Sequence, residues 1–140
     1  MRVALDLRAV MDTNVFISGV FFSGVPNKIL QAWQSGEFEL VVSHEILDEY
    51  RRVGEILAEE HPGVDLNPIL NFVIEHARVY KPVTLKEAIC EDPDDDKFFA
   101  CALSSGSKVI ISGDKHLLKV SGYQRIEVLK PREFVDRYLG

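Results

Sequence analysis

Short apolar segments typical of β-strands alternate along this chain with longer segments of helical periodicity. The strand-like segments, rich in β-branched and aromatic residues, cover residues 8–11, 38–42, 79–83, 108–112 and 126–129. Between them, apolar residues recur every three or four positions, as on the buried face of a helix. Strands that alternate with helices form a mostly parallel sheet with helices on both faces. The sequence therefore predicts an α/β fold.

Length and composition are those of one globular domain. The chain has 140 residues, 46% of them apolar and 27% charged, and no linker, repeat or low-complexity tract divides it. We therefore expect a single domain over residues 1–140. No apolar run is long enough to cross a membrane, and Asp6 and Arg8 interrupt what would be the core of a signal peptide. Cys90 and Cys101 have no metal-binding spacing. These features predict a cytoplasmic protein with reduced cysteines.

The charge balance limits how the protein could bind nucleic acid. The 22 acidic residues outnumber the 16 basic ones, which gives a net charge of −6. A broad, non-specific grip on nucleic acid needs a basic surface, so that class of binder is excluded. An enzyme that acts on nucleic acid is still compatible with this charge, provided that its acids gather where a divalent cation can neutralise them.

Three acids occupy positions from which they could meet. Asp12 and Asp114 each follow the end of a predicted strand, and ligands bind beyond such ends where the strand order reverses. If the two strands are neighbours there, the two carboxylates lie close together. Glu49 borders the apolar stripe that begins at Ile46, in the helix predicted after Ser43. It is the acid of that helix best placed to lean over the sheet.

A fourth acid comes from the acidic turn at residues 92–96. Asp96 shares its helical face with Phe99, so we expect it to point inward at a helix N-terminus, where the macrodipole favours a carboxylate. Asp95 is the alternative for this role. Asp92 could also reach the site, although its place before a proline is more typical of a loop residue.

The predicted cluster favours a divalent metal ion. Four inward carboxylates without a paired Lys or Arg would repel one another. Oxygen ligands suit Mg²⁺ or Mn²⁺, whereas zinc prefers Cys and His. Such an ion can activate water and stabilise the leaving oxygen in phosphodiester hydrolysis. Each acid taken alone is more typical of a cap, a turn or a solvated surface, so the hypothesis depends on the combination.

The motifs that carry these acids resemble those of the PIN domain family. They are Asp12-Thr13-Asn14 after a strand, Ser43 with Glu49 six residues later, residues 92–100, Ser112-Gly113-Asp114, and Pro131-Arg132-Glu133-Phe134. The motifs occur in the family's order and cover residues 12–134. Among family members, the chain looks most like the stand-alone prokaryotic proteins of the VapC type, the toxins of toxin–antitoxin pairs.

The resemblance implies a fold and an activity. The fold would be a three-layer α/β/α sandwich around a parallel sheet of four to five strands. The activity would be that of an Mg²⁺- or Mn²⁺-dependent endoribonuclease. Its catalytic acids would be Asp12, Glu49, Asp96 and Asp114, of which Asp12, Asp96 and Asp114 would hold the metal. Thr13, Asn14 and Ser112 would orient these carboxylates.

The same resemblance implies partners for the protein. They are a second copy of the chain, in a homodimer, and a small antitoxin protein whose tail occupies the acidic groove. Basic residues close to the acids in sequence are candidate RNA contacts: Arg51, Arg52, Lys97 and Lys115. Residues 1–7, which precede the usual start of the first motif, would be an extra strand, a tail, or the product of a start codon upstream of Met11. The alternative function is that of a non-catalytic PIN-fold module that binds RNA or protein.

Overall fold

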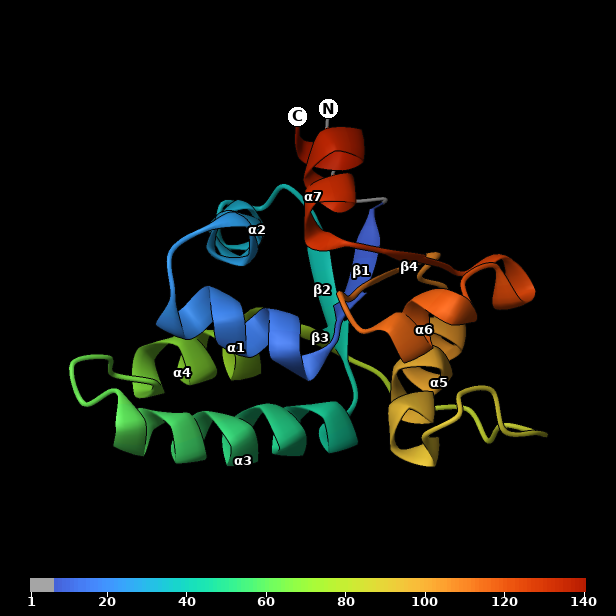
Figure 1. The fold of residues 1–140 in the computed structure, drawn as a ribbon, viewed down its shortest axis with the longest axis horizontal. Coiled ribbons are helices and arrows are strands. Elements are labelled where there is room, and N and C mark those ends of the chain that lie inside the picture. The colour runs from blue at the N-terminus through green and yellow to red at the C-terminus, as the bar shows by residue number, and fades with distance from the viewer. Residues whose placement is uncertain (1–6) are drawn as a thin grey trace.

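A five-stranded parallel sheet forms the centre of the computed structural model, which describes residues 7–140 (Figure 1). Its strands lie in the order β3-β2-β1-β4-β5. They are β1 (Arg8–Met11), β2 (Glu39–Val42), β3 (Arg78–Val79), β4 (Val109–Ile111) and β5 (Glu127–Leu129). Apart from Leu7, the segment expected to be an extra strand or a tail lies outside the described residues.

Helices cover both faces of this sheet. The α-helices are α1 (Thr13–Phe21), α2 (Val25–Gln34), α3 (His44–Glu60), α4 (Asn67–His76), α5 (Asp96–Ser105), α6 (Lys115–Lys119) and α7 (Pro131–Phe134). Two 3₁₀ turns, η2 (Pro93–Asp95) and η3 (Tyr123–Arg125), and a π-helical segment, η4 (Val135–Leu139), complete the chain. Helices α1, α3 and α4 lie on one side of the sheet, and α5 and α6 lie on the other (Figure 1). The predicted α/β/α sandwich is thus confirmed. None of the helices described is long and apolar enough to cross a membrane.

Most elements lie where the sequence places them, and β3 is the exception. The predicted strand covers residues 79–83, whereas β3 contains only Arg78 and Val79, at the edge of the sheet. Pro82 has no N–H to donate to a neighbouring strand, which favours an early end to the pairing. Both residues of β3 are exposed, as is common in an edge strand.

The strand order reverses between β1 and β4, as the predicted meeting of Asp12 and Asp114 requires. The chain proceeds from β1 to β2 and β3 on one side, then crosses to β4 and β5 on the other. Met11 pairs with Ile111, and the Asp12 N–H continues the ladder by donating to the Ile111 carbonyl at 3.0 Å. Asp12 and Ser112 therefore leave the sheet side by side, at its reversal point.

Tyr50 ties two helices to the end of β1. Its side chain is fully buried, and its hydroxyl donates to the Met11 carbonyl at 2.6 Å. Its ring stacks on Phe16 of α1, with the ring centroids 4.1 Å apart. Because Glu49 precedes Tyr50 on α3, this buried contact also holds Glu49 near the carboxyl end of the sheet.

Candidate active site

Asp12 is the buried acid at the centre of the candidate site. Only 3% of the residue is exposed. Its Oδ1 caps α1 by accepting from the Val15 N–H at 2.8 Å, and its Oδ2 accepts from the Ser112 hydroxyl. Burial raises the pKa of Asp12 to about 6, because it outweighs the opposing effect of these two hydrogen bonds. The charges of Asp114 and Asp95 raise it further in the same direction.

Ser112 links Asp12 to Asp114. Its hydroxyl donates to the Asp12 carboxylate and accepts from the Asp114 backbone N–H at 2.9 Å. The Asp114 Oδ1 accepts from the His116 N–H at 2.7 Å and so caps α6. Its Oδ2 accepts no hydrogen bond from the residues described. Ser112 therefore orients two acids, which is the role that the family resemblance implies for it.

Asp95 is the third acid in this electrostatic environment. It ends the 3₁₀ turn η2 and is half-buried. Burial raises the pKa of Asp95, and the largest contribution after burial is the charge of Asp114. Lys97 opposes this shift, while Asp92 and Asp94 add to it. The charge of Asp114 thus helps to raise the pKa of both Asp12 and Asp95.

Asp96 faces a different part of the chain. Its Oδ1 accepts from the Cys90 N–H at 2.7 Å, and its Oδ2 accepts from the Ile89 N–H at 3.2 Å. The side chain points inward, as expected, but it anchors the backbone that leads into η2. The prediction placed a turn at residues 92–95 and a helix N-terminus at Asp96, and the structure has the 3₁₀ turn η2 there, followed by α5. The charge of Asp95 acts on Asp12, and that of Asp114 acts on Asp95, which favours Asp95, the alternative, as the acid that joins the other two.

Glu49 has a positive partner that the sequence did not predict. Its carboxylate pairs with the Lys97 ammonium of α5, whose side chain is only 4% exposed. Lys97 also pairs with Asp94 at 3.0 Å and donates to its carbonyl at 2.7 Å. The expectation that the inward acids lack a paired Lys therefore fails for Glu49. Because the Lys97 ammonium is buried against protein carboxylates, Lys97 is a weaker candidate for RNA contact than the exposed basic residues.

The other predicted residues lie at the edge of this group or away from it. Asn14 is exposed and makes no hydrogen bond to an acid within residues 7–140. The Thr13 hydroxyl is buried without a partner in the same part of the chain, so it is available to water or a ligand.

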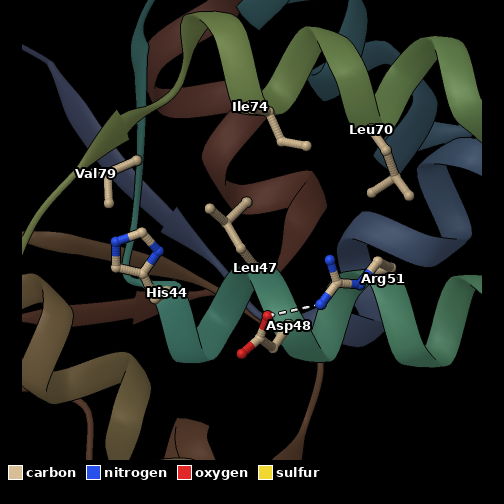
Figure 2. Close-up of a pocket in the computed structure, with 7 residues that line it drawn as sticks. All are labelled: His44, Leu47, Asp48, Arg51, Leu70, Ile74 and Val79. Carbon is tan, nitrogen blue, oxygen red and sulfur yellow. Dashed lines mark hydrogen bonds and ion pairs between the residues drawn. The ribbon is translucent and has the colours of Figure 1, made fainter.

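The three exposed basic candidates differ in their surroundings. Arg51 pairs with Asp48 at 2.9 Å and lines a hollow between α3 and α4 (Figure 2). Arg52 and Lys115 are exposed and form no ion pair within the described part of the chain, so they stay candidates for RNA contact. Arg51 is a weaker candidate because Asp48 already neutralises it.

A family model described as a PIN domain matches residues 8–116. The chain belongs to the PIN domain family. The matched span includes Asp12, Glu49, Asp95, Asp96 and Asp114. No match was found among curated proteins. PIN domains are usually nucleases and generally use divalent metal ions, so the family supports a nuclease in a general sense.

The carboxylate and hydroxyl oxygens at this site of the PIN domain suit a hard divalent cation, although the acids do not form a preassembled metal-binding cluster. Among residues 7–140, no three His, Cys, Asp or Glu side chains come close enough to form a metal-binding group. Mg²⁺ keeps several of its waters and is commonly bound through one or two carboxylates, so spaced acids are compatible with it. The oxygen-only donors, the raised pKa values of Asp12 and Asp95, and the unpartnered Thr13 hydroxyl all fit a hydrated cation.

Two features of the site could not be found from the sequence. The role of Asp95 depends on the 3₁₀ turn, for which Asp92-Pro93 at its start is the only local signal. The Lys97–Glu49 pair joins side chains 48 positions apart in sequence, and no spacing rule predicts such a contact.

The buried charge of Asp12 should make the stability of the protein depend on pH. A carboxyl with an ordinary pKa of 3.8 that titrates at about 6 in the folded protein is destabilised as an anion, so the penalty grows as the pH rises from about 4 to 6. Asp12→Asn removes that charge. We expect the variant to be more stable than the wild type by about 2–3 kcal/mol at pH 7.5 and about equal to it below pH 4. Urea unfolding at both pH values measures the difference.

The exposed Asp136→Asn variant is the control for removing one negative charge. It is expected to change stability little at either pH. If Asp12→Asn and Asp136→Asn gave the same difference at both pH values, the buried charge of Asp12 would not be the cause.

The buried ion pair between Lys97 and Glu49 should contribute to stability as a unit. Lys97→Met leaves the Glu49 carboxylate without its partner, and we expect a loss of about 3 kcal/mol in the free energy of unfolding. The double variant Lys97→Met/Glu49→Gln removes both charges and should recover a large part of that loss. Urea unfolding of the wild type, both single variants and the double variant completes the cycle. Strictly additive losses would show that the two side chains do not interact.

Proposed function

We propose that this PIN domain is an endoribonuclease that depends on Mg²⁺ or Mn²⁺. The observation that carries the proposal is the electrostatic interaction of Asp95 in η2 with Asp12 and Asp114, which follow the carboxyl ends of β1 and β4. Burial and mutual repulsion raise the pKa of Asp12 and of Asp95. A divalent cation would remove that repulsion, which gives this fold a physical reason to bind one.

Each residue has a distinct part in the proposal. Asp12, Asp95 and Asp114 would hold the ion, which when bound supplies a water of lowered pKa and stabilises the leaving oxygen. Ser112 fixes the orientation of Asp12 and Asp114 through its two hydrogen bonds. Glu49, neutralised by Lys97, would join α3 to α5 and keep Asp95 in place rather than bind the ion. Asp96 would anchor the segment before η2.

RNA as the substrate rests on the resemblance to VapC-type proteins. With a net charge of −6, the protein has few basic side chains near the acids. Arg52 and Lys115 are exposed and could contact phosphates, which supports binding of a single strand at the acids rather than a broad grip on a duplex.

The experiment is cleavage of a mixed, end-labelled RNA pool with Mg²⁺, with Mn²⁺ and with EDTA. We expect cleavage with either metal and none with EDTA. Asp12→Asn and Asp95→Asn should each lower the rate by more than about 100-fold, which exceeds the usual effect of losing a group outside the metal's ligands. Asp96→Asn should keep cleavage and lower the melting temperature, because one of its two backbone hydrogen bonds is lost.

The variants separate the possible results. If the Asp95→Asn protein were active and the Asp96→Asn protein were folded but inactive, Asp96 and not Asp95 would be the third metal ligand. A folded wild type that neither cleaves RNA nor binds Mn²⁺ in calorimetry would favour the alternative, a non-catalytic module that binds RNA or protein.

We further propose that this ribonuclease is the toxin of a toxin–antitoxin pair and acts in the cytoplasm. A toxin of this kind should stop growth when its expression is induced in a bacterial host, and the Asp12→Asn protein should not. Colony counts after induction, with immunoblots to match the protein levels, measure the effect. Equal growth arrest by both proteins would show that toxicity does not come from cleavage.

A homodimer and a small antitoxin partner belong to the same proposal. A hollow of about 350 Å³ between α3 and α4 presents apolar side chains from three elements, among them Leu47, Leu70, Ile74 and Val79 (Figure 2). Ile74 is 60% exposed and Val79 is 44% exposed. Exposed apolar side chains grouped in this way support a protein contact on that face.

A further inference from the structure

A second hollow of about 350 Å³, more open to solvent than the one between α3 and α4, has Asp114 in its lining. Asn14, Val15 and Ser18 of α1 form one wall, Pro26 and Pro131 contribute apolar surface, and the Gly113-Asp114 turn forms the side next to the site. Asp114 therefore belongs both to the acid group and to this cavity. A molecule bound here would lie next to whatever the acids hold.

Asn14 brings unused hydrogen-bonding capacity to this cavity. It is exposed, and its amide makes no hydrogen bond with the described part of the chain. An amide offers an acceptor oxygen and two donor hydrogens side by side. The Ser18 hydroxyl likewise makes no side-chain hydrogen bond among residues 7–140. The polar groups of this wall are thus available to a ligand.

The shape and the remaining walls suit a flat, partly apolar group. Val15, Pro26 and Pro131 present carbon surface, and Gly113 has open space where a side chain would stand. The volume lies at the lower end of the range for small-molecule sites. That size is sufficient for one nucleobase.

We propose that this cavity, the Asn14 pocket, binds one unpaired nucleobase of the RNA strand, adjacent to the phosphate that the acids cleave. This inference rests on the proposed function. The Asn14 amide would pair with a donor and an acceptor on the edge of the base, while the proline and valine surfaces contact its face. Sequence-specific RNA recognition commonly uses bases splayed out of single-stranded segments in this way. A base within an A-form duplex is stacked, so the pocket selects for unpaired RNA at the cut.

The first test uses cleavage of a randomised single-stranded RNA, with sequencing of the product ends. We expect the wild type to prefer particular bases at one position next to the cut. Asn14→Ala should reduce that preference, measured as a ratio of kcat/KM values for two short RNAs, by about 10-fold. Ser18→Phe fills the pocket from the partly exposed face of α1 and should raise KM more than it lowers kcat. Asn71→Ala, an exposed change on α4, is the matched control and should leave the preference intact.

The second test does not require cleavage. Wild-type protein in EDTA is titrated with each of the four nucleoside 5′-monophosphates, and NMR follows the side-chain amide signals of Asn14 and of Asn71. We expect the Asn14 signals to shift with the preferred nucleotide and the Asn71 signals to stay unchanged. Thermal melting of each variant confirms that it folds.

These experiments distinguish a failure of the base-binding proposal from a failure of the proposed ribonuclease function. Suppose that the protein cleaves RNA in a metal-dependent way with a base preference, and that neither Asn14→Ala nor Ser18→Phe alters this preference. That result would overturn the base-binding role of the Asn14 pocket and would leave the proposed ribonuclease activity standing. An absence of cleavage would count against the ribonuclease, and the NMR titration would then decide the pocket by itself. Asn14 signals that no nucleotide shifts would overturn the base-binding inference.

Discussion

The candidate site depends on one hydroxyl group at the reversal point of the sheet. Pairing between β1 and β4 runs one residue past β1, through the Asp12 N–H and the Ile111 carbonyl, so that Asp12 and Ser112 leave the sheet together. The Ser112 hydroxyl donates to Asp12 and accepts from the backbone of Asp114. Because a hydroxyl can do both at once, one buried side chain orients two acids that are 102 positions apart in sequence. Every role proposed for these acids assumes that alignment.

The inward acids fall into two groups that differ in the partners of their carboxylates. Glu49 is neutralised by the buried Lys97, and Asp96 is satisfied by two backbone N–H groups. Asp12, Asp95 and Asp114 form no ion pair within residues 7–140, and burial raises the pKa of Asp12 and of Asp95. Two of these acids, Asp12 and Asp114, follow the carboxyl ends of β1 and β4, and Asp95 ends η2. PIN domains generally use divalent metal ions, and the metal proposed for this chain would offset the charge of these acids.

In the proposed function, the acids would carry out the cleavage and the Asn14 pocket would recognise a base. In the proposed ribonuclease, the acids would act on a phosphate, which is identical in every nucleotide, so they could not distinguish one RNA sequence from another. The Asn14 pocket offers an available amide and apolar walls next to Asp114. A protein with a net charge of −6 gains little from general attraction to RNA. Recognition of a base beside the metal would supply selectivity that charge does not.

Local patterns in the sequence were sufficient for the fold and for part of the site. The alternation of strand and helix signals predicted the parallel sheet, and the strand ends before Asp12 and Asp114 predicted their convergence, which the pairing of β1 with β4 confirms. The choice between Asp95 and Asp96 could not be made in this way, because it depends on contacts with distant segments: Asp96 accepts from the backbone of Ile89 and Cys90, whereas the charge of Asp95 acts on Asp12. Nor could the partner of Glu49 be found, because Lys97 lies on another helix. The sequence by itself determined which acids stand at the ends of strands, since periodicity and turn residues act locally. Only the tertiary structure decided which of the inward acids are buried and which of them lack a cationic partner, since burial and ion pairing depend on contacts between distant segments.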